Sequence, residues 1–246
     1  MAIGITQIDT FSTGTSETVE VALTVAANSW LVVTFSDGDG TNRVATCSSS
    51  PSCSWTVRQD QTSGYPNNAV AFAFFAAGGS ITVSPVFTST SAGKRSACLY
   101  ELSGCEGTAG GAYAVNGDPS ATTTPSTNIT TTRTDSLLIG VCGNEGAVQG
   151  AYTLRTPPTL TLDFEHNGGV GTNRAYHLSS NGVSVATHTV GLSAPANQSW
   201  SAAWLEMRVG GAALTGTALS SISEQDIKDG SKTIIITLTG TTWVAS

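Results

Sequence analysis

Ser29-Trp-Leu-Val-Val-Thr-Phe-Ser-Asp-Gly-Asp-Gly40 resembles a later stretch of the same chain, Asp135-Ser-Leu-Leu-Ile-Gly-Val-Cys-Gly-Asn-Glu-Gly146, at an offset of 106 positions. At this offset Leu31 matches Leu137. A second stretch, Arg95-Ser-Ala-Cys-Leu-Tyr-Glu-Leu102, matches Trp200-Ser-Ala-Ala-Trp-Leu-Glu-Met207 at an offset of 105. Two matches at nearly one offset predict that the chain is built from two related halves. Chance similarity between short apolar strands is the alternative.

Period-two alternation predicts that both halves consist of half-buried strands. Apolar side chains alternate with polar ones in residues 18–25 and 159–165, so one face of each segment turns to a core. Further strands are predicted near 29–36, 54–59, 68–76, 80–88, 95–103, 136–142, 151–155, 174–179, 183–192 and 198–208. Gly, Asn, Pro and Ser separate these segments, which is typical of a sandwich or barrel with many short strands.

The composition favours the same fold class. The 246 residues include 37 Thr and 30 Ser but only 3 Lys, and 11% of the side chains are charged, against about 25% in an average soluble domain. Thr has a branched Cβ that suits a pleated, half-exposed surface, whereas the good helix formers Lys, Glu and Gln are scarce. A helical bundle is therefore excluded and an all-β protein is expected.

These observations predict an antiparallel, jelly-roll-like β-sandwich over residues 1–209, with halves at about 1–104 and 127–209 that close over one core. Each half is expected to contain a hairpin, which turns at Gly78-Gly79 in the first half and at Asn181-Gly182 in the second. The Gly-, Thr- and Pro-rich residues 104–134 would cross between the halves over the surface. Residues 210–246 would form a small C-terminal β segment.

Charge and hydropathy exclude two classes of partner. The net charge is −7 and no basic cluster is larger than Lys94-Arg95, so there is no electrostatic footprint for nucleic acid. The longest apolar run, residues 69–77, is about half of what spans a bilayer, which predicts no membrane partner. No basic residue precedes Arg43, so no signal peptide is seen. Cys47 and Cys53 could close a short disulfide loop, or remain free in a reducing cytosol.

Two motifs are weak candidates for metal sites. In Asp37-Gly-Asp-Gly-Thr-Asn42 the side chains of Asp37, Asp39 and Asn42 could supply oxygens to a hard cation, but the closing Glu of a calcium loop is missing and a turn is the better interpretation. His166, His177 and His188 are spaced by 11 residues, and a turn at 181–182 would place His177 and His188 on one face. Ordinary outward-facing histidines are favoured over a metal site.

Evidence for catalysis is absent from the sequence. Glu101 and Glu206 occupy matching positions in the two halves and could suggest paired carboxylates, although exposure to solvent or a subunit contact explains them as well. The sequence contains no nucleophile elbow, His-Glu-x-x-His pair, phosphate loop or dinucleotide fingerprint. We therefore predict that the protein is not an enzyme and carries no cofactor.

Aromatic side chains could line a sugar-binding face, with packing in the core as the favoured alternative. The candidates for such a face are Trp30, Trp55, Trp200, Trp204, Tyr65, Tyr113 and Tyr152. A glycan is therefore kept as a further candidate partner.

Two stretches resemble proteins of bacteriophage particles. The 18–208 region, with the phrases Ser29-Trp-Leu-Val-Val-Thr-Phe-Ser and Ala97-Cys-Leu-Tyr-Glu-Leu-Ser-Gly104, resembles duplicated jelly-roll-like sandwiches of phage virion proteins and of some bacterial surface proteins. The C-terminal residues 213–243 are similar to a module that recurs in phage structural proteins. The resemblance implies a non-enzymatic virion component, either a capsid decoration protein or a head-fibre subunit, assembled in the host cytoplasm. Its partners would be copies of itself and a major capsid or other virion protein. A carbohydrate- or receptor-binding module of a phage tail or bacterial surface is the alternative.

Residues 212–246 are expected to pack against the sandwich or against another subunit. Ile234, Ile235 and Ile236 follow one another in a β-branched run, so either face of that strand exposes at least one isoleucine, and Trp243 lies just beyond. An exposed strand of this kind is an aggregation hazard unless it is paired or covered. These four residues are therefore the predicted interface residues.

Overall fold

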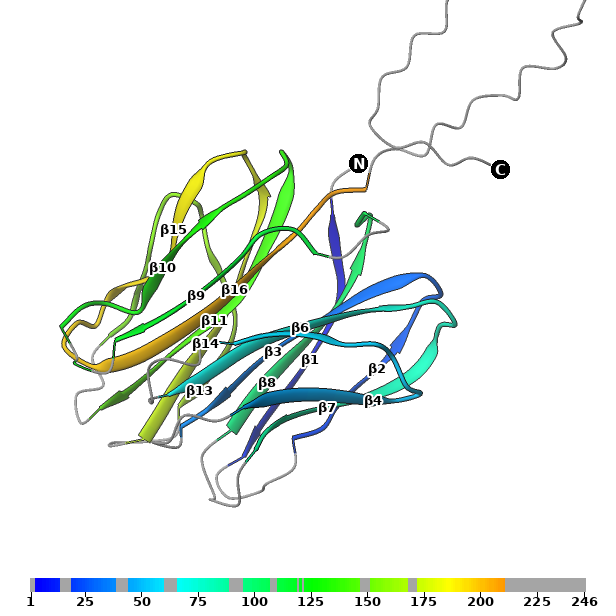
Figure 1. Cartoon of the computed structure of the whole chain (residues 1–246), viewed down its shortest axis with the longest axis horizontal. Coiled ribbons are helices and arrows are strands. Elements are labelled where there is room, and N and C mark those ends of the chain that lie inside the picture. The colour runs from blue at the N-terminus through cyan, green and yellow to red at the C-terminus, as the bar shows by residue number, and fades with distance from the viewer. Residues whose placement is uncertain are drawn as a thin grey trace, which may run out of the picture.

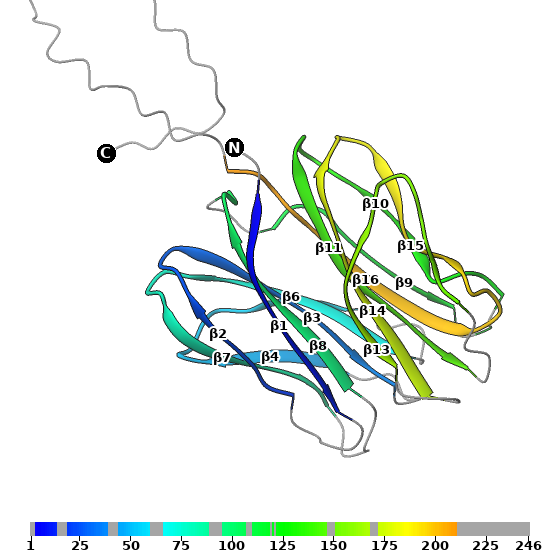
Figure 2. The same ribbon diagram turned by 180° about the vertical axis from the view of Figure 1, so that it is seen from behind.

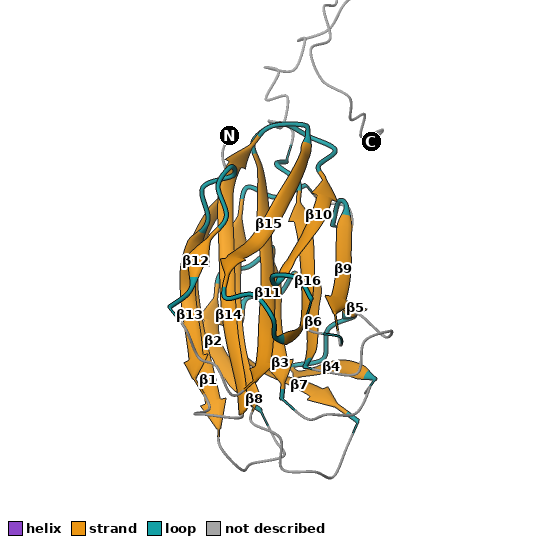
Figure 3. Cartoon of the chain, turned by 90° about the vertical axis from the view of Figure 1, so that its left-hand side faces the viewer, coloured by secondary structure: helices purple, strands orange, loops and turns teal. Residues whose placement is uncertain are grey.

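The computed structural model describes residues 3–210 apart from 14–18, 39–43, 60–65, 89–94, 107–109, 119, 121, 147–150 and 168–171. The described part contains sixteen strands and no helix, which confirms the prediction of an all-β antiparallel sandwich (Figure 3). The strands of the first half are β1 (Gly4–Thr13), β2 (Val21–Val25), β3 (Ser29–Asp37), β4 (Ala45–Ser50), β5 (Thr56–Gln59), β6 (Asn67–Phe75), β7 (Gly79–Phe87) and β8 (Arg95–Ser103). Those of the second half are β9 (Tyr113–Asp118), β10 (Ser126–Thr130), β11 (Ser136–Gly146), β12 (Thr153–Leu154), β13 (Thr161–Asn167), β14 (Thr172–Val183), β15 (Thr187–Ala194) and β16 (Ser199–Met207).

The two halves have the same strand order, which supports the predicted duplication. In the first half a five-stranded sheet has the order β1-β8-β3-β6-β5 and a three-stranded sheet the order β2-β7-β4. In the second half the corresponding orders are β9-β16-β11-β14-β13 and β10-β15-β12, so every strand of the first half has a counterpart eight elements later. Figure 1 shows the halves side by side, blue to cyan and green to yellow.

The four sheets stack as layers, with the five-stranded sheets inside and the three-stranded sheets outside. Buried side chains form three clusters: one between the sheets of the first half, one between those of the second half, and one where the two inner sheets meet face to face. The reverse view in Figure 2 shows the inner strands β3 and β11 between the outer sheets. The expectation of one shared core is therefore wrong: each half has its own core, and a third core joins the halves.

The register of the inner sheets corrects the predicted alignment by one residue. Leu31 pairs with Glu101, and the corresponding Glu206 pairs with Leu138, so the true offset along β3 and β11 is 107. Leu31 and Leu138 point into the cores of their own halves, whereas Leu137 points to the interface between the halves. A slip of one residue exchanges the two faces of a strand. The predicted match of Leu31 with Leu137 therefore equated a residue of the first half's own core with a residue of the interface between the halves.

With the corrected register, one buried pair shows how the halves diverged. Val33 pairs with Leu99 in the first half, and Gly140 pairs with Trp204 at the same place in the second half. A Cβ added at Gly140 would lie 2.2 Å from Cδ2 of Trp204. The smaller residue on β11 thus makes room for the larger one on β16, which keeps the volume of the core.

Both predicted hairpins are wrong. Strand β6 belongs to an inner sheet and β7 to an outer sheet, so Gly78 (φ 70°) lies in a connection between sheets and Gly79 (φ 102°) is the first residue of β7. Asn181 and Gly182 lie within β14, where the register with β11 shifts, so they form a bulge and not a turn.

Residues 104–134 contain β9 and β10 as well as the crossing, so the second half begins earlier than residue 127. The predicted jelly-roll topology is not confirmed: each half is an antiparallel β-sandwich of one five-stranded and one three-stranded sheet.

Candidate functional site

The Glu101 carboxylate is a structural acceptor inside the first half. It lies on β8, is 3% exposed, and accepts hydrogen bonds from the backbone N of Ala26 (2.6 Å), Ser29 Oγ (2.8 Å) and Thr6 Oγ1 (2.8 Å). Burial by itself would raise the pKa of this carboxyl group, but the three hydrogen bonds outweigh burial and the pKa lies below its ordinary value. Glu101 is thus an ionised anchor for the turn before β3.

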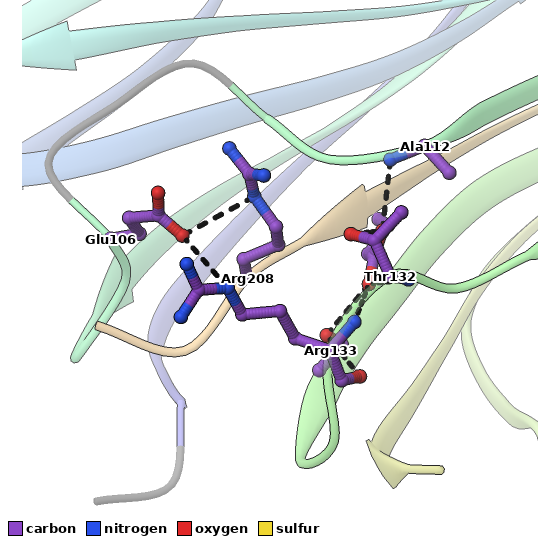
Figure 4. A network of polar contacts seen from close by, with 7 residues as sticks. Glu106, Ala112, Thr132, Arg133 and Arg208 are labelled. Atoms are coloured by element: carbon purple, nitrogen blue, oxygen red, sulfur yellow. Dashed lines mark hydrogen bonds and ion pairs between the residues drawn. The ribbon is translucent and has the colours of Figure 1, made fainter. Parts of the chain in front are cut away.

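Glu206 has the same role in the second half, with more donors. It accepts hydrogen bonds from the backbone N of Ala112 (2.9 Å), Thr132 (2.8 Å) and Arg133 (3.1 Å), and from the hydroxyls of Thr132 and Ser136 (2.8 Å each). Burial again opposes ionisation, and the hydrogen bonds again lower the pKa. Figure 4 labels three of the donor residues, Ala112, Thr132 and Arg133.

The two carboxylates are equivalent by duplication and do not form a catalytic pair. Ser29 and Ser136, which both donate to the carboxylates, each follow a residue of positive φ, Asn28 (60°) and Asp135 (59°). Asn and Asp tolerate the left-handed backbone conformation that a tight turn needs. Each half therefore contains the same motif: a tight turn, the Ser that follows it, and a buried Glu that accepts hydrogen bonds from the Ser and from the backbone near the turn. Among the described residues, the hydrogen bonds to each of these two carboxylates come from its own half.

A second cluster of polar side chains lies beside Glu206, close to the last described residues of the chain. The Glu106 carboxylate lies 3.5 Å from Nε of Arg133 and 3.3 Å from Nε of Arg208, as Figure 4 shows. The backbone N of Glu106 also donates to the carbonyl of Arg208 (2.8 Å). These contacts tie the segment between the halves to the end of β16. The three side chains are partly exposed, so the ion pairs contribute little to stability.

The candidate calcium loop, for which a turn was the favoured interpretation, is not supported where the structure describes it. Asp37 is fully buried at the end of β3 and forms an ion pair with Arg95, with 3.2 Å between Oδ2 and Nε. A carboxylate in a buried ion pair is not available to a cation from solvent. Asp39 and Asn42 lie outside the described residues.

The histidines do not form a metal site in the described part of the chain. His177 lies on β14 in an inner sheet and His188 on β15 in an outer sheet, so the predicted common face does not exist. His188 is hydrogen-bonded to the carbonyl of Ser184 (2.9 Å). His166 lies on β13 and is 8% exposed. Among the described residues, no three His, Cys, Asp or Glu side chains come together in a group that could hold a metal ion.

His177 instead connects the two halves. Its Nδ1 lies 2.7 Å from Thr34 Oγ1 and its Nε2 lies 2.9 Å from Ser96 Oγ, both in the first half. The ring is fully buried, and burial together with the charge of His166 lowers the pKa of His177 to about 3. The pairing of Ser96 with His177 has the distance of a nucleophile and its base, but Ser96 is itself fully buried, so the contact is structural.

Other polar contacts across the same interface also join unlike positions. Tyr100 Oη donates to Asp163 (3.1 Å), and Asn68 Nδ2 donates to the carbonyl and the hydroxyl of Ser201 (2.9 and 2.8 Å). Burial raises the pKa of Asp163, although hydrogen bonds from Ser179 and Tyr100 act in the opposite direction. Val70 occupies the position in the first half that corresponds to His177 and cannot form its hydrogen bonds, so these contacts fit the first half to the second and not to a copy of itself.

The aromatic candidates do not form a sugar-binding face. Trp200 and Trp204 are buried in the core of the second half, Trp55 packs against that of the first, and Trp30 belongs to the cluster between the halves. Tyr152 lies partly buried against the core of the second half, with its ring centroid 5.0 Å from that of Tyr176. Tyr113 is 53% exposed with the Arg58 guanidinium 4.5 Å from its ring centroid, and Tyr65 lies outside the described residues. The alternative of core packing was correct for the four tryptophans.

A groove of about 490 Å³ lies at one edge of the first inner sheet, and sequence reasoning missed it. No charged side chain or histidine lines it. Its walls are the end of β6, the start of β3 and the segment before β5, with Trp30, Pro51, Ser52, Cys53, Ser54, Thr56, Phe72, Ala73, Phe74, Phe75, Ala76 and Ala77 as lining residues. Cys47 and Cys53 are both free cysteines, and burial together with the neighbouring Cys53 raises the pKa of Cys47. The groove can take an apolar group but offers no acid or base.

Comparisons with known proteins give no relative from which a function can be transferred. No family model, no curated protein and no solved structure matches this chain. In the described residues no helix is long and apolar enough to cross a membrane. The predicted interface residues Ile234, Ile235, Ile236 and Trp243 lie outside the described residues.

Proposed function

We propose that the protein is a non-enzymatic structural subunit that assembles with copies of itself, in the manner expected of a bacteriophage capsid decoration or head-fibre protein. The observation that carries the proposal is the chemistry of the two outer sheets. Their six strands contain no Asp, Glu, Lys or Arg at all. The strands of the outer sheets are therefore uncharged, although the chain as a whole carries a net charge of −7.

The exposed side chains of these sheets are mainly short hydroxyls. Thr24 and Ser80 lie 3.3 Å apart on the first outer sheet, and Thr130 and Thr187 lie 2.8 Å apart on the second. Charged groups lose strong hydration when a partner covers them, whereas short hydroxyls lose little side-chain entropy and less hydration. Such faces suit close contact between neighbouring copies, and charges are depleted at the centres of protein interfaces in general.

The buried ionisable groups favour the same conclusion. Glu101, Glu206, Asp37 and His177 are each held by hydrogen bonds or an ion pair inside the fold. The groove is lined by no titratable side chain except Cys53. A structural role accounts for these groups without a reaction.

Self-association of the full chain tests the proposal. In sedimentation velocity the purified protein should form oligomers, and Thr24→Lys with Ser48→Lys on the first outer sheet should weaken them at least tenfold in dissociation constant. Val185→Lys, at an exposed turn, is the matched control and should leave association unchanged. Imaging of native particles should find the chain on the particle. A monomer at high concentration that is also absent from purified particles would contradict the proposal.

The alternative is a carbohydrate- or receptor-binding module, favoured by the aromatic groove at Trp30 and Phe74. A glycan array decides between the two. Selective binding that is lost on Phe74→Ala but retained in Tyr113→Ala would favour recognition of a glycan, and absence of binding would leave the structural role.

A further inference from the structure

The groove lies along a part of β6 whose outer edge is not paired with another described strand. Strand β5 pairs with β6 only from Ala69 to Phe72, whereas β3 pairs with β6 as far as Phe75. Before Thr56 the chain leaves the sheet as residues 51–55, which form the opposite wall of the groove. On the side away from β3, no described strand pairs with residues 73–75. Such an edge can accept an added extended segment.

The groove also continues the apolar interface between the two halves. Trp30 and Phe72 belong to the buried cluster that joins the inner sheets. Phe74 is the next residue on the same face of β6, and its ring centroid lies 5.5 Å from that of Trp30. Yet Phe74 is 44% exposed, which makes it one of the few exposed large apolar side chains of the described structure. The second half covers this face as far as Phe72 and leaves its end open.

The chain leaves the described fold at the same end of the same sheet. Val209 bridges to Cys105, and the backbone N of Gly210 donates to the carbonyl of Gly104 (2.7 Å). Gly104 directly follows β8, whose Leu102 pairs with Trp30, which in turn pairs with Phe74. Leu102 is therefore two strand spacings, or roughly 10 Å, from Phe74, and Gly104 lies two residues, or roughly 7 Å along the strand, beyond Leu102. Residues 211–231 can span several times that distance.

We propose that residues 232–240 of the same chain add as a strand to the edge of β6 at residues 73–75, where their isoleucines cover Trp30 and Phe74. The chemistry of the two surfaces agrees, because residues 233–240 contain no charged side chain and the groove is lined by none. The closeness of the exit gives this segment a high effective concentration at the groove of its own chain compared with that of a neighbour. Docking would give hydrogen-bond partners to the backbone groups on the unpaired edge of β6 and would cover Phe74.

Photochemical crosslinking in the full chain tests the site and the occupant together. The photoreactive residue p-benzoylphenylalanine replaces Phe74, and equal amounts of isotopically light and heavy protein are mixed before irradiation. We expect crosslinks from position 74 to residues 232–240 within chains of one isotope. The same photoreactive residue at Tyr113, which is exposed elsewhere, should give none. Crosslinks that join light to heavy chains in about half of the products would assign the groove to a neighbouring copy and overturn the proposal, as would the absence of any crosslink.

Hydrogen exchange gives a second measurement that needs no crosslinker. In full-length protein the amides of residues 73–75 should exchange at least about tenfold faster in Ile235→Asp than in the unchanged chain. Ile227→Asp, an isoleucine outside the proposed strand, is the matched control and should have no effect there. Equal exchange in all three proteins would refute docking. The result is independent of the proposed function, because self-association is measured separately through the outer sheets.

Discussion

At the scale of single residues, Glu206 and Glu101 offer a paired test of their structural role. Glu206→Gln keeps the shape but turns one acceptor into a donor, which faces the backbone N–H of either Ala112 or Thr132. Loss of charge-assisted hydrogen bonds in a buried site should lower the free energy of unfolding by about 2–4 kcal/mol. Glu101→Gln, which disturbs fewer donors, should cost less. Urea denaturation measures both, and a variant as stable as the unchanged protein would contradict the anchoring role.

The interface histidine predicts how stability depends on pH. In the unfolded chain the pKa of His177 has its ordinary value of 6.5, and in the fold burial lowers it to about 3. Between these values the unfolded chain binds a proton that the folded chain does not. The free energy of unfolding should therefore be highest above pH 6.5 and fall as the pH decreases, by up to about 1.4 kcal/mol per pH unit.

Urea titrations at pH 7, 6 and 5 would measure this dependence. Glu101 and Glu206 have lowered pKa values, so their contribution is lost only below their ordinary pKa of 4.5, and the window above pH 5 reports mainly on His177. His177→Gln should flatten the profile in that window. If that variant does not fold, the imidazole carbon shifts of His177 in the unchanged protein at pH 5 should still be those of a neutral ring. A protonated ring at pH 5 would refute the assignment.

At the scale of strands, the exchange of sizes between β11 and β16 makes Gly140 the most sensitive small residue of the core. Gly140→Ala places a Cβ within 2.2 Å of the Trp204 ring, so the indole or β11 must move. Overpacking of this kind costs about 1–3 kcal/mol, although alanine usually stabilises a strand relative to glycine. Thermal denaturation should show a lower melting temperature. The double variant Gly140→Val with Trp204→Leu, which reproduces the pair of the first half, should recover part of the loss.

The strands that the sequence did not predict share a structural position. The prediction missed β1, β4, β9 and β10, and each of these is the edge strand of its sheet. Edge position alone does not explain the omission, because the edge strands β2 and β13 were predicted from their alternation. The missed strands do not alternate large apolar residues with polar ones regularly, as Ala45-Thr-Cys-Ser-Ser-Ser50 illustrates. Central strands such as β3 are buried on both faces and were recognised from their apolar runs. Which of those faces meets which core could not be predicted, because an apolar run without alternation does not fix its own register.

The sequence showed which residues were candidates for a site, but not which residues they contact. Matching glutamates were visible in the repeat, yet their donors come from turns that are about 70 residues or more away in sequence. The groove arises because β5 stops short of the end of β6, and the length of an edge strand is a property of the tertiary structure. Both the glutamate contacts and the groove depend on how distant segments pack together, so the local sequence pattern does not predict them.

At the scale of the whole molecule, the core between the halves should make unfolding cooperative. Residues from both inner sheets are fully buried there, among them Val32 and Ile139. Calorimetry should therefore show one transition with equal calorimetric and van't Hoff enthalpies. Ile139→Asp buries an unpaired charge between the halves while leaving the two outer cores intact, and it should split the transition in two. Two transitions in the unchanged protein would mean that the halves fold independently.

The Gly140 and Trp204 pair also limits how this gene can continue to evolve. A change at one position alone toward its counterpart in the first half would give a mismatched pair. Valine at position 140 alone would set its side chain against the indole, and leucine at position 204 alone would leave a cavity where the indole had been. Either change alone should destabilise the second half, so the two positions have to change together.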